Sequence, residues 1–243
     1  MKILRQSRVL IFGQHLTSRT EAVRDYLLNK VDEVYCLGVG SYSVDKKESH
    51  AFYYKNGSLV KHYLFKHRIL KYIKRRELSI PVTFFTYIFD VVRALIIFRK
   101  RFDIFIGISH FPGLIGVILK TFGICKKSIY YTIDYYVPHT EIDHKNPFSG
   151  YGWFERQLLK ISIWIDKVSV NNADEIWDIS GRIEEGRRKF IKLEWEKYRE
   201  KRKIVPLGYS KLFFRNKPIN EIERNSIVFV GVTLPSQGLE LIL

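Results

Sequence analysis

Two side chains that can take up a proton stand at the ends of apolar segments. His110 follows the run DIFIGIS, residues 103 to 109, and Asp134 lies near the end of SIYYTIDY, residues 128 to 135. An imidazole or a carboxylate within reach of a substrate hydroxyl acts as a general base. Both residues also have a structural interpretation, His110 as a satisfied core histidine and Asp134 as the cap of the following turn.

A third candidate lies near the N-terminus, where the apolar run of residues 9 to 12 ends at Gly13. The polar residues Gln14 and His15 follow, and a helix is predicted over about residues 19 to 29. A loop between a first strand and a helix N-terminus is where phosphate or substrate often binds. The full GxGxxG pattern is absent, so the loop is not a dinucleotide fingerprint.

Apolar strands alternate with helical patterns along most of the chain. Two strands, at residues 9–12 and 34–39, flank the first helix, and this βαβ unit predicts a parallel sheet. Residues 51–65 predict a hairpin around Asn56-Gly57. Further strands are predicted at 103–109, 128–135, 174–180 and 204–208, and further helices at 83–98, from after Gly113 to about 122, at 153–170 and at 181–190. The fold class expected is α/β, a Rossmann-like parallel sheet with helices on both faces.

The last stretch, residues 226–243, has the pattern with which an α/β domain begins. SIVFVGVTLPSQGLELIL contains an apolar strand ending at Gly231, a loop, and Gly238 before an apolar helical turn. We therefore expect residues 1–208 to form one domain and residues 209–225 to be a linker. Residues 226–243 would be the first strand and loop of a second, truncated domain.

The charge and cysteine content of the chain indicate which classes of binding partner to expect. The chain has 41 Lys and Arg against 25 Asp and Glu, a net charge of +16. Such a balance favours nucleic acid, an anionic membrane or a phosphorylated substrate, although a lysine-rich genome would also produce it. No helix-turn-helix, zinc-finger or RNP pattern is present, so nucleic acid is not the expected partner. The two cysteines, Cys36 and Cys125, have no metal-site or disulfide spacing.

Two segments, residues 61–76 and 83–102, combine basic residues with aromatic and aliphatic ones. This composition favours contact with anionic lipid, and the alternative is a solvated basic face over a buried stripe. Within the second segment, Phe84, Ile88, Val91, Leu95 and Phe98 fall at helical spacing, which predicts a helix that is either buried or membrane-facing. The run is too short and too charged to span a bilayer, and the N-terminus lacks a signal peptide. A cytoplasmic protein, peripheral on the inner face of the membrane, is expected.

The order of these motifs resembles the family-four glycosyltransferases of GT-B fold. ADEIWDIS, a helix, IVPLGYS and then IVFVG with QGLELIL follow the family's succession of "aD.vi..S", "vvpnGvd..f" and "fvGrl...KG...ll". The Gly13 loop, the strand before His110, and TIDY at residues 132–135 fit the family's first half. The resemblance spans nearly the whole chain.

The resemblance implies an N-terminal acceptor domain and a C-terminal domain for a nucleotide sugar. It implies hexosyl transfer to a glycan or lipid-linked acceptor, as in cell-envelope polysaccharide synthesis. No metal or other cofactor is expected, because a helix N-terminus and cationic side chains neutralise the leaving diphosphate. By the same resemblance, His110 and Asp134 are catalytic, Gly13, Gln14, His15 and Tyr135 contact substrate, and Gly231, Gln237 and Gly238 form the donor-phosphate loop.

Two positions depart from the family pattern. Val232 stands where the family often has Arg, and Gln237 stands where it often has Lys. Those cations meet the diphosphate, so their absence predicts either a donor site that binds phosphate through backbone amides or a weak or altered donor site. With the second domain truncated, we expect little or no transfer by these 243 residues alone. A non-catalytic binding module and a basic nucleic-acid-binding domain are the alternative functions.

Overall fold

The first of two compact units carries every residue that the structure, a computed structural model, describes. The units are Met1–Ser210 and Lys211–Leu243. The described residues are 6–14, 18–39, 48–67, 76–133 and 153–206. The predicted linker at 209–225 and the predicted second-domain segment at 226–243 lie outside them.

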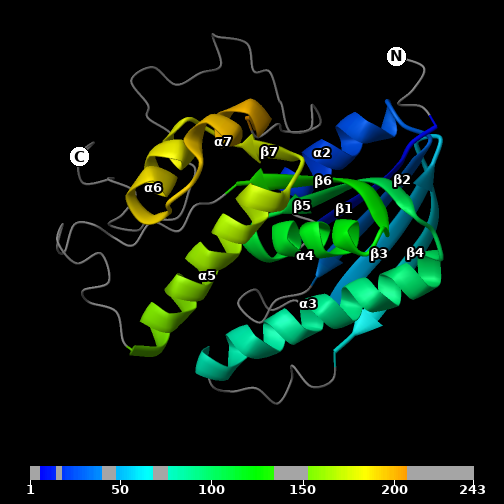
Figure 1. Ribbon diagram of the computed structural model, residues 1–243. Coiled ribbons are helices and arrows are strands. Elements are labelled where there is room, and N and C mark those ends of the chain that lie inside the picture. The colour runs from blue at the N-terminus through cyan, green and yellow to red at the C-terminus, as the bar shows by residue number, and fades with distance from the viewer. Residues whose placement is uncertain (1–5, 15–17, 40–47, 68–75, 134–152, 207–243) are drawn as a thin grey trace, which may run out of the picture. The chain divides into compact units, whose positions relative to one another are not determined.

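An eight-stranded sheet forms the centre of this unit, in the order β4-β3-β2-β1-β5-β6-β7-β8 (Figure 1). The strands are β1 (Arg8–Gln14), β2 (Glu33–Val39), β3 (Glu48–Lys55), β4 (Ser58–Lys66), β5 (Phe102–Ile108), β6 (Cys125–Thr132), β7 (Glu175–Asp178) and β8 (Arg202–Ile204). All neighbouring pairs from β2 to β8 are parallel, whereas β3 and β4 add an antiparallel hairpin at the edge. The predicted hairpin is confirmed, and its turn uses left-handed backbone at Asn56 (φ 50°) and Gly57 (φ 79°).

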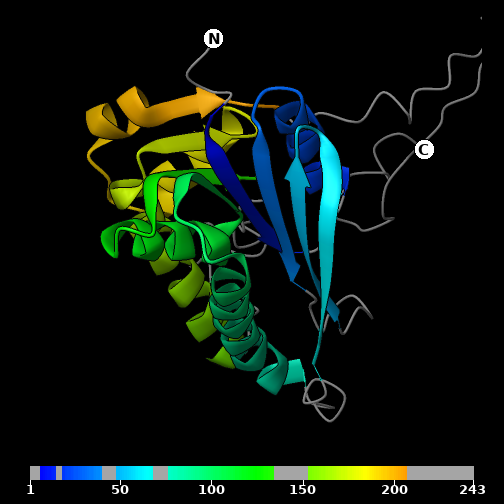
Figure 2. The ribbon, with the colours of Figure 1, turned by 90° about the vertical axis from the view of Figure 1, so that its right-hand side faces the viewer.

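Helices cover both faces of the sheet, which confirms the predicted α/β fold (Figures 1 and 2). The helices are α2 (Ser18–Leu28), α3 (Arg76–Phe98), α4 (His110–Thr121), α5 (Trp153–Asn172), α6 (Arg182–Phe190) and α7 (Trp195–Lys201). Val23 and Leu27 of α2 pack on one face, against Val9 and Ile11 of β1. On the other face, α3 and α4 cover Leu10 and Phe12, and α4, α5 and α7 share a further core cluster around Tyr130. Among the described residues, no helix is long and apolar enough to cross a bilayer.

The strands that follow β1 in the chain are added on both sides of it, with β2 on one side and β5 on the other. From β1 it passes through α2 on one face to β2, whereas from the hairpin it returns through α3 on the other face to β5, on the far side of β1. The junction between β1 and β5 is therefore a topological switch point. In open α/β sheets, ligands bind outside the carboxyl ends of the strands at such a point.

Helix α4 lies unusually close to the sheet because two glycines leave room for it. A Cβ atom on Gly107 of β5 would lie 2.3 Å from the Pro112 carbonyl oxygen. A Cβ atom on Gly113 of α4 would lie 2.5 Å from the ring of Tyr130 in β6. These contacts hold the first turn of α4, and with it His110, against the ends of β5 and β6.

The Gly113→Ala variant should therefore be less stable than the wild type. Tyr130 is fully buried and its hydroxyl donates a 2.6 Å hydrogen bond to Asp166, so its ring has little freedom to move aside. Overpacking of this kind costs about 1–3 kcal/mol, which exceeds the gain of about 1 kcal/mol in helix propensity. Urea denaturation measures the difference. Gly181→Ala is the matched control, because its Cβ would meet nothing within 4 Å and its φ is −61°. Equal losses in the two variants would contradict the close packing of α4.

Two predicted helix faces are wrong in detail. In α3, which begins at Arg76, Val91 and Phe98 are buried as predicted, but Ile88 is 40% exposed. In α5 the sequence predicts one apolar face formed by Phe154, Leu158, Ile161, Ile165 and Val168. Ile165 is buried, but Ile161 is 49% exposed. Polar side chains are turned inward instead, among them Asp90 in α3 and Asp166 and Ser169 in α5. Hydrophobic periodicity does not count buried polar residues, so the predicted faces were rotated. The last strand is also displaced, since β8 ends at Ile204 where the sequence predicted it to begin.

Candidate active site at the carboxyl edge of the sheet

His110 lies where β5 turns sharply into α4. The preceding residue, Ser109, has φ 78° and ψ 174°, a conformation that non-glycine residues rarely adopt. Its N–H donates to the carbonyl of Tyr131 (2.9 Å), and its carbonyl accepts from the N–H of Gly113 (3.0 Å). Such strained backbone persists only where the surroundings hold it, and it often occurs at functional sites. His110 itself is 5% exposed, and its ring meets that of Tyr130 edge to face at 6.4 Å.

Gly13 lies near the carboxyl end of β1, the strand next to β5, at the same edge of the sheet. It pairs with Gly38 of β2, and the last residue of β1, Gln14, pairs with Val39. On the other side of β1, Phe12 pairs with Gly107 of β5. The structure thus brings the end of β1 and the β5–α4 turn to the two sides of the switch point.

The other predicted site residues lie outside the part of the chain that the structure describes. For these the assignments stay predictions: His15, Asp134, Tyr135, Gly231, Gln237 and Gly238.

A cluster of buried charges lies next to His110 and was not predicted. At its centre is Arg187 of α6, which is fully buried. Its Nε and Nη2 donate to the two carboxylate oxygens of Asp166 in α5, both at 2.9 Å. Its Nη1 donates to Asp178 at the end of β7 (2.9 Å) and to the Tyr198 hydroxyl (3.0 Å), and its Nη2 donates to Thr132 Oγ1 (2.7 Å). One guanidinium therefore ties α5, α6 and α7 to the carboxyl ends of β6 and β7.

The cluster continues to the surface through Arg202 of β8. Its Nε donates to Asp178 Oδ2 (2.9 Å) and its Nη1 to Glu184 Oε2 (2.6 Å). Glu184 also accepts from two exposed arginines, Arg188 and Arg199. The charges alternate in sign from the interior outward, so no buried carboxylate of this cluster is left without a cation.

Electrostatics keep the centre of this cluster ionised. Burial alone would raise the pKa of Asp166, but the Arg187 guanidinium, with smaller contributions from His110 and Tyr130, holds it below its ordinary value. Burial would likewise lower the pKa of Arg187, and Asp166 and Asp178 raise it well above its ordinary value. Burial, together with the neighbouring Asp166, raises the pKa of the Tyr130 hydroxyl.

The sequence carries one signal for this cluster, and it is weak. Arg187 stands four residues after Ile183, and both side chains are buried in α6. Asp166 is next to Ile165 on the buried side of α5. A charged residue at a core position of one helix predicts a partner of opposite charge elsewhere, but does not say where.

The cluster positions other groups and has little capacity for a ligand. Each nitrogen of Arg187 already donates to a protein oxygen, so the guanidinium is committed to structure. Among the described residues, no group of three or more His, Cys, Asp or Glu side chains is arranged to hold a metal ion. Among the described residues at the switch point, the His110 imidazole is a group that can transfer a proton.

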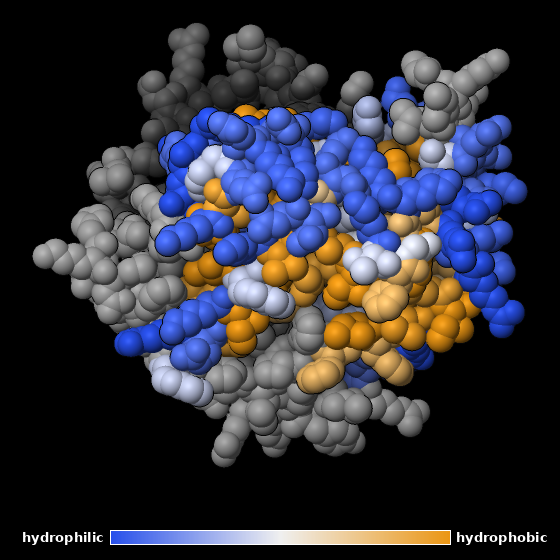
Figure 3. Space-filling model, viewed as in Figure 1, coloured by the Kyte–Doolittle hydropathy of each residue, from blue (hydrophilic) through white to orange (hydrophobic). Residues whose placement is uncertain are grey.

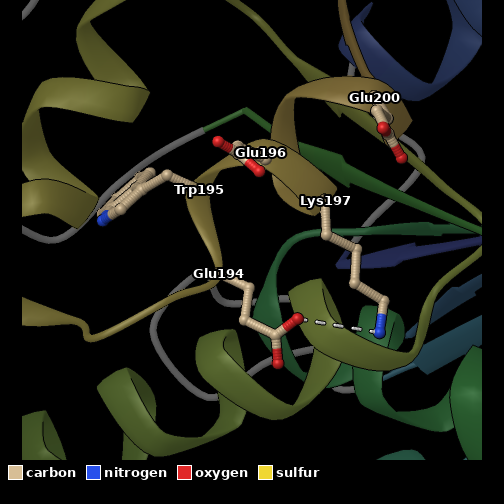
Figure 4. A pocket seen from close by; sticks show the side chains of 5 residues that line it. All are labelled: Glu194, Trp195, Glu196, Lys197 and Glu200. Carbon is tan, nitrogen blue, oxygen red and sulfur yellow. Dashed lines mark ion pairs between the residues drawn. The ribbon is translucent and has the colours of Figure 1, made fainter.

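A hollow in the surface lies elsewhere, beside α7. It is lined by Glu194, Trp195, Glu196, Lys197 and Glu200 (Figure 4). Its ion pair, from Lys197 Nζ to Glu194 Oε2 at 4.0 Å, joins two mostly exposed side chains, and such surface pairs contribute little energy. None of the residues at the carboxyl edge of β1 or β5 lines it, so we do not assign the active site there.

Comparison with known proteins gives little beyond the fold. The sequence matches no protein-family model and no curated protein. Among solved structures, it is similar to the catalytic domain of Starch Synthase IV from Arabidopsis thaliana bound to ADP and acarbose, with a TM-score of 0.49 and 9% sequence identity. The match covers 84% of this chain and 52% of that one, so the chain spans about half the length of that structure. A likeness of this size carries no argument about function.

Proposed function

We propose that this protein is a glycosyltransferase, moving a hexosyl group from a nucleotide sugar to a glycan or lipid-linked acceptor. The observation that carries the proposal is that β1, which contains Gly13, and β5, which His110 follows, are neighbouring parallel strands at the topological switch point. The order of the sequence motifs assigns substrate contact to the first and proton transfer to the second. That two residues 97 positions apart end on neighbouring strands supports both assignments.

His110 would serve the acceptor. With the acceptor hydroxyl against its ring, the imidazole takes the hydroxyl proton while the oxygen bonds to the anomeric carbon and the nucleoside diphosphate leaves with its electron pair. The imidazolium that forms lies near the ionised Asp166, whose charge favours it. Because Asp166 is held by Arg187 and Tyr130, the carboxylate stays in place during the transfer.

The remaining assignments complete the proposal. The first unit holds the acceptor, with Gln14, His15 and Tyr135 in contact with it and Asp134 as a second catalytic group. Gly231, Gln237 and Gly238 hold the donor diphosphate through backbone amides, since Val232 and Gln237 do not supply the usual cations. No metal takes part in this scheme.

The test is transfer by the full-length protein. It is incubated with a panel of uridine, guanosine and adenosine diphosphate sugars, with lipid-linked and free glycan acceptors, and release of the nucleoside diphosphate is followed. We expect acceptor-dependent release with one class of donor, unchanged by EDTA.

Three results would contradict the proposal. If the protein bound nucleotide sugars without turnover, it would be a non-catalytic binding module. Salt-sensitive binding of DNA or RNA without any sugar transfer would assign a nucleic-acid-binding domain. Loss of transfer on adding EDTA would contradict a metal-independent mechanism.

A further inference from the structure

Helix α3 presents an uncovered apolar face to solvent. Phe89 is 58% exposed and Ile96 is 60% exposed, and Val92 lies between them at helical spacing. Ile88 and Ile97 flank this stripe and are also exposed. The opposite side of the helix carries Tyr87, Val91, Ala94 and Phe98 into the core. Figure 3 shows hydrophobic residues gathering over α3 and continuing toward α4 and α5 on the same face.

The charge that this part of α3 presents outside the core is positive. Between residues 85 and 98 the charged residues are Asp90 and Arg93. Asp90 is fully buried on the inner side, with its Oδ2 2.9 Å from His67 Nε2. Arg93 lies over the ring of Phe89, 5.2 Å from its centroid. The helix then ends at the exposed basic run of residues 99 to 101.

We propose that this face of α3 docks the protein on an anionic lipid bilayer. The stripe of Phe89, Val92 and Ile96 would enter the boundary between headgroups and acyl chains. Arg93 and residues 99 to 101 would extend toward the lipid phosphates, as long cationic side chains do at a membrane surface. A net charge of +16 would draw the whole chain to a negative surface.

Charge and shape favour a bilayer over other occupants. In a symmetric dimer the same patch meets itself, so Arg93 and the basic run would face their own copies and repel. The stripe also lies away from the core, because Tyr87, Val91, Ala94 and Phe98 occupy the inner side of the helix, which covers one face of the sheet (Figure 2). An exposed apolar stripe with cationic flanks enters a fluid surface without needing a complementary groove.

This inference does not depend on the proposed function, because its test measures binding and not transfer. The protein is floated with vesicles of phosphatidylcholine alone and with vesicles containing about 30 mol % phosphatidylglycerol. We expect at least about tenfold stronger partitioning onto the anionic vesicles, weakening as salt is raised. The triple variant Phe89→Ser, Val92→Ser, Ile96→Ser should lose at least about tenfold of that binding.

The control is Tyr26→Ser, an exposed aromatic on α2, which packs on the opposite face of the sheet. This variant should bind as the wild type does. Circular dichroism and a denaturation curve verify that the triple variant is folded. Equal binding of wild type and triple variant, or equal binding to neutral and anionic vesicles, would overturn the proposal. If the wild type did not bind vesicles but formed a concentration-dependent dimer that the triple variant abolished, the face would instead be a dimer interface.

Discussion

Replacing Arg187 with methionine should lower the free energy of unfolding by about 3–5 kcal/mol, because it leaves buried carboxylates without their cation. Methionine occupies similar space but donates no hydrogen bond. Asp166 would keep the hydrogen bond from the Tyr130 hydroxyl, whereas Asp178 would keep Arg202 and Tyr198. Denaturation by urea, followed by far-UV circular dichroism, measures the loss.

The adjacent residue provides the control. Arg188 is half-exposed and pairs with Glu184 at 2.8 Å, with its guanidinium 4.5 Å from the Trp195 ring centroid. Arg188→Met should cost no more than about 1 kcal/mol. Adding Asp166→Leu to Arg187→Met should recover part of the loss, since apolar replacement of a buried pair is often neutral. If Arg187→Met were as stable as Arg188→Met, the cluster would not hold the fold together.

For catalysis, the His110→Gln variant has the largest expected effect. Glutamine retains polarity but does not take up a proton, and loss of a general base lowers kcat by about 10²- to 10⁴-fold. KM should change little, because the lost interaction belongs to the transition state. The limb of the pH profile of kcat/KM that reports the base should disappear. Steady-state transfer assays of the full-length protein across pH measure all three quantities.

His62→Gln is the matched histidine control. His62 is an exposed residue of the edge strand β4, stacked on Phe52 at 4.3 Å, and three strands separate β4 from β5. Its kcat and pH profile should equal those of the wild type. Should His110→Gln keep both the rate and the pH profile of the wild type, His110 would be a structural residue and the base would have to be sought elsewhere, first at Asp134.

Features encoded by adjacent residues could be predicted from the sequence. The turn at Asn56-Gly57 and the ends of β1 and β5 follow from local chain signals, and the structure has the turn where expected and the strand ends within two residues of the expected positions. His110 and Gly13 were therefore found as residues at strand ends. Their proximity in space follows from the strand order, in which β5 lies beside β1, and short-range patterns do not encode that order.

Features that depend on distant partners could not be predicted. Arg187 and Asp166 are 21 residues apart on different helices, and each alone resembles a surface charge. Helix α3 presents the converse difficulty. It is apolar on nearly every side, so periodicity does not distinguish its core face from the exposed stripe. In both cases a buried polar side chain, Arg187 in α6 or Asp90 in α3, marks the face that lies against the core.

The two margins of the sheet bear on solubility. A strand with unpaired backbone groups invites the strand of another molecule, and proteins guard against this with short strands, lysines, prolines and bulges. Strand β8 is three residues long, begins with Arg202 and Lys203, and is followed within two residues by Pro206. At the other margin, β4 bears the exposed Lys61 and Lys66, and its pairing with β3 is interrupted by a bulge near Tyr53. Both margins thus discourage the edge-to-edge aggregation to which a sheet this wide would otherwise be exposed.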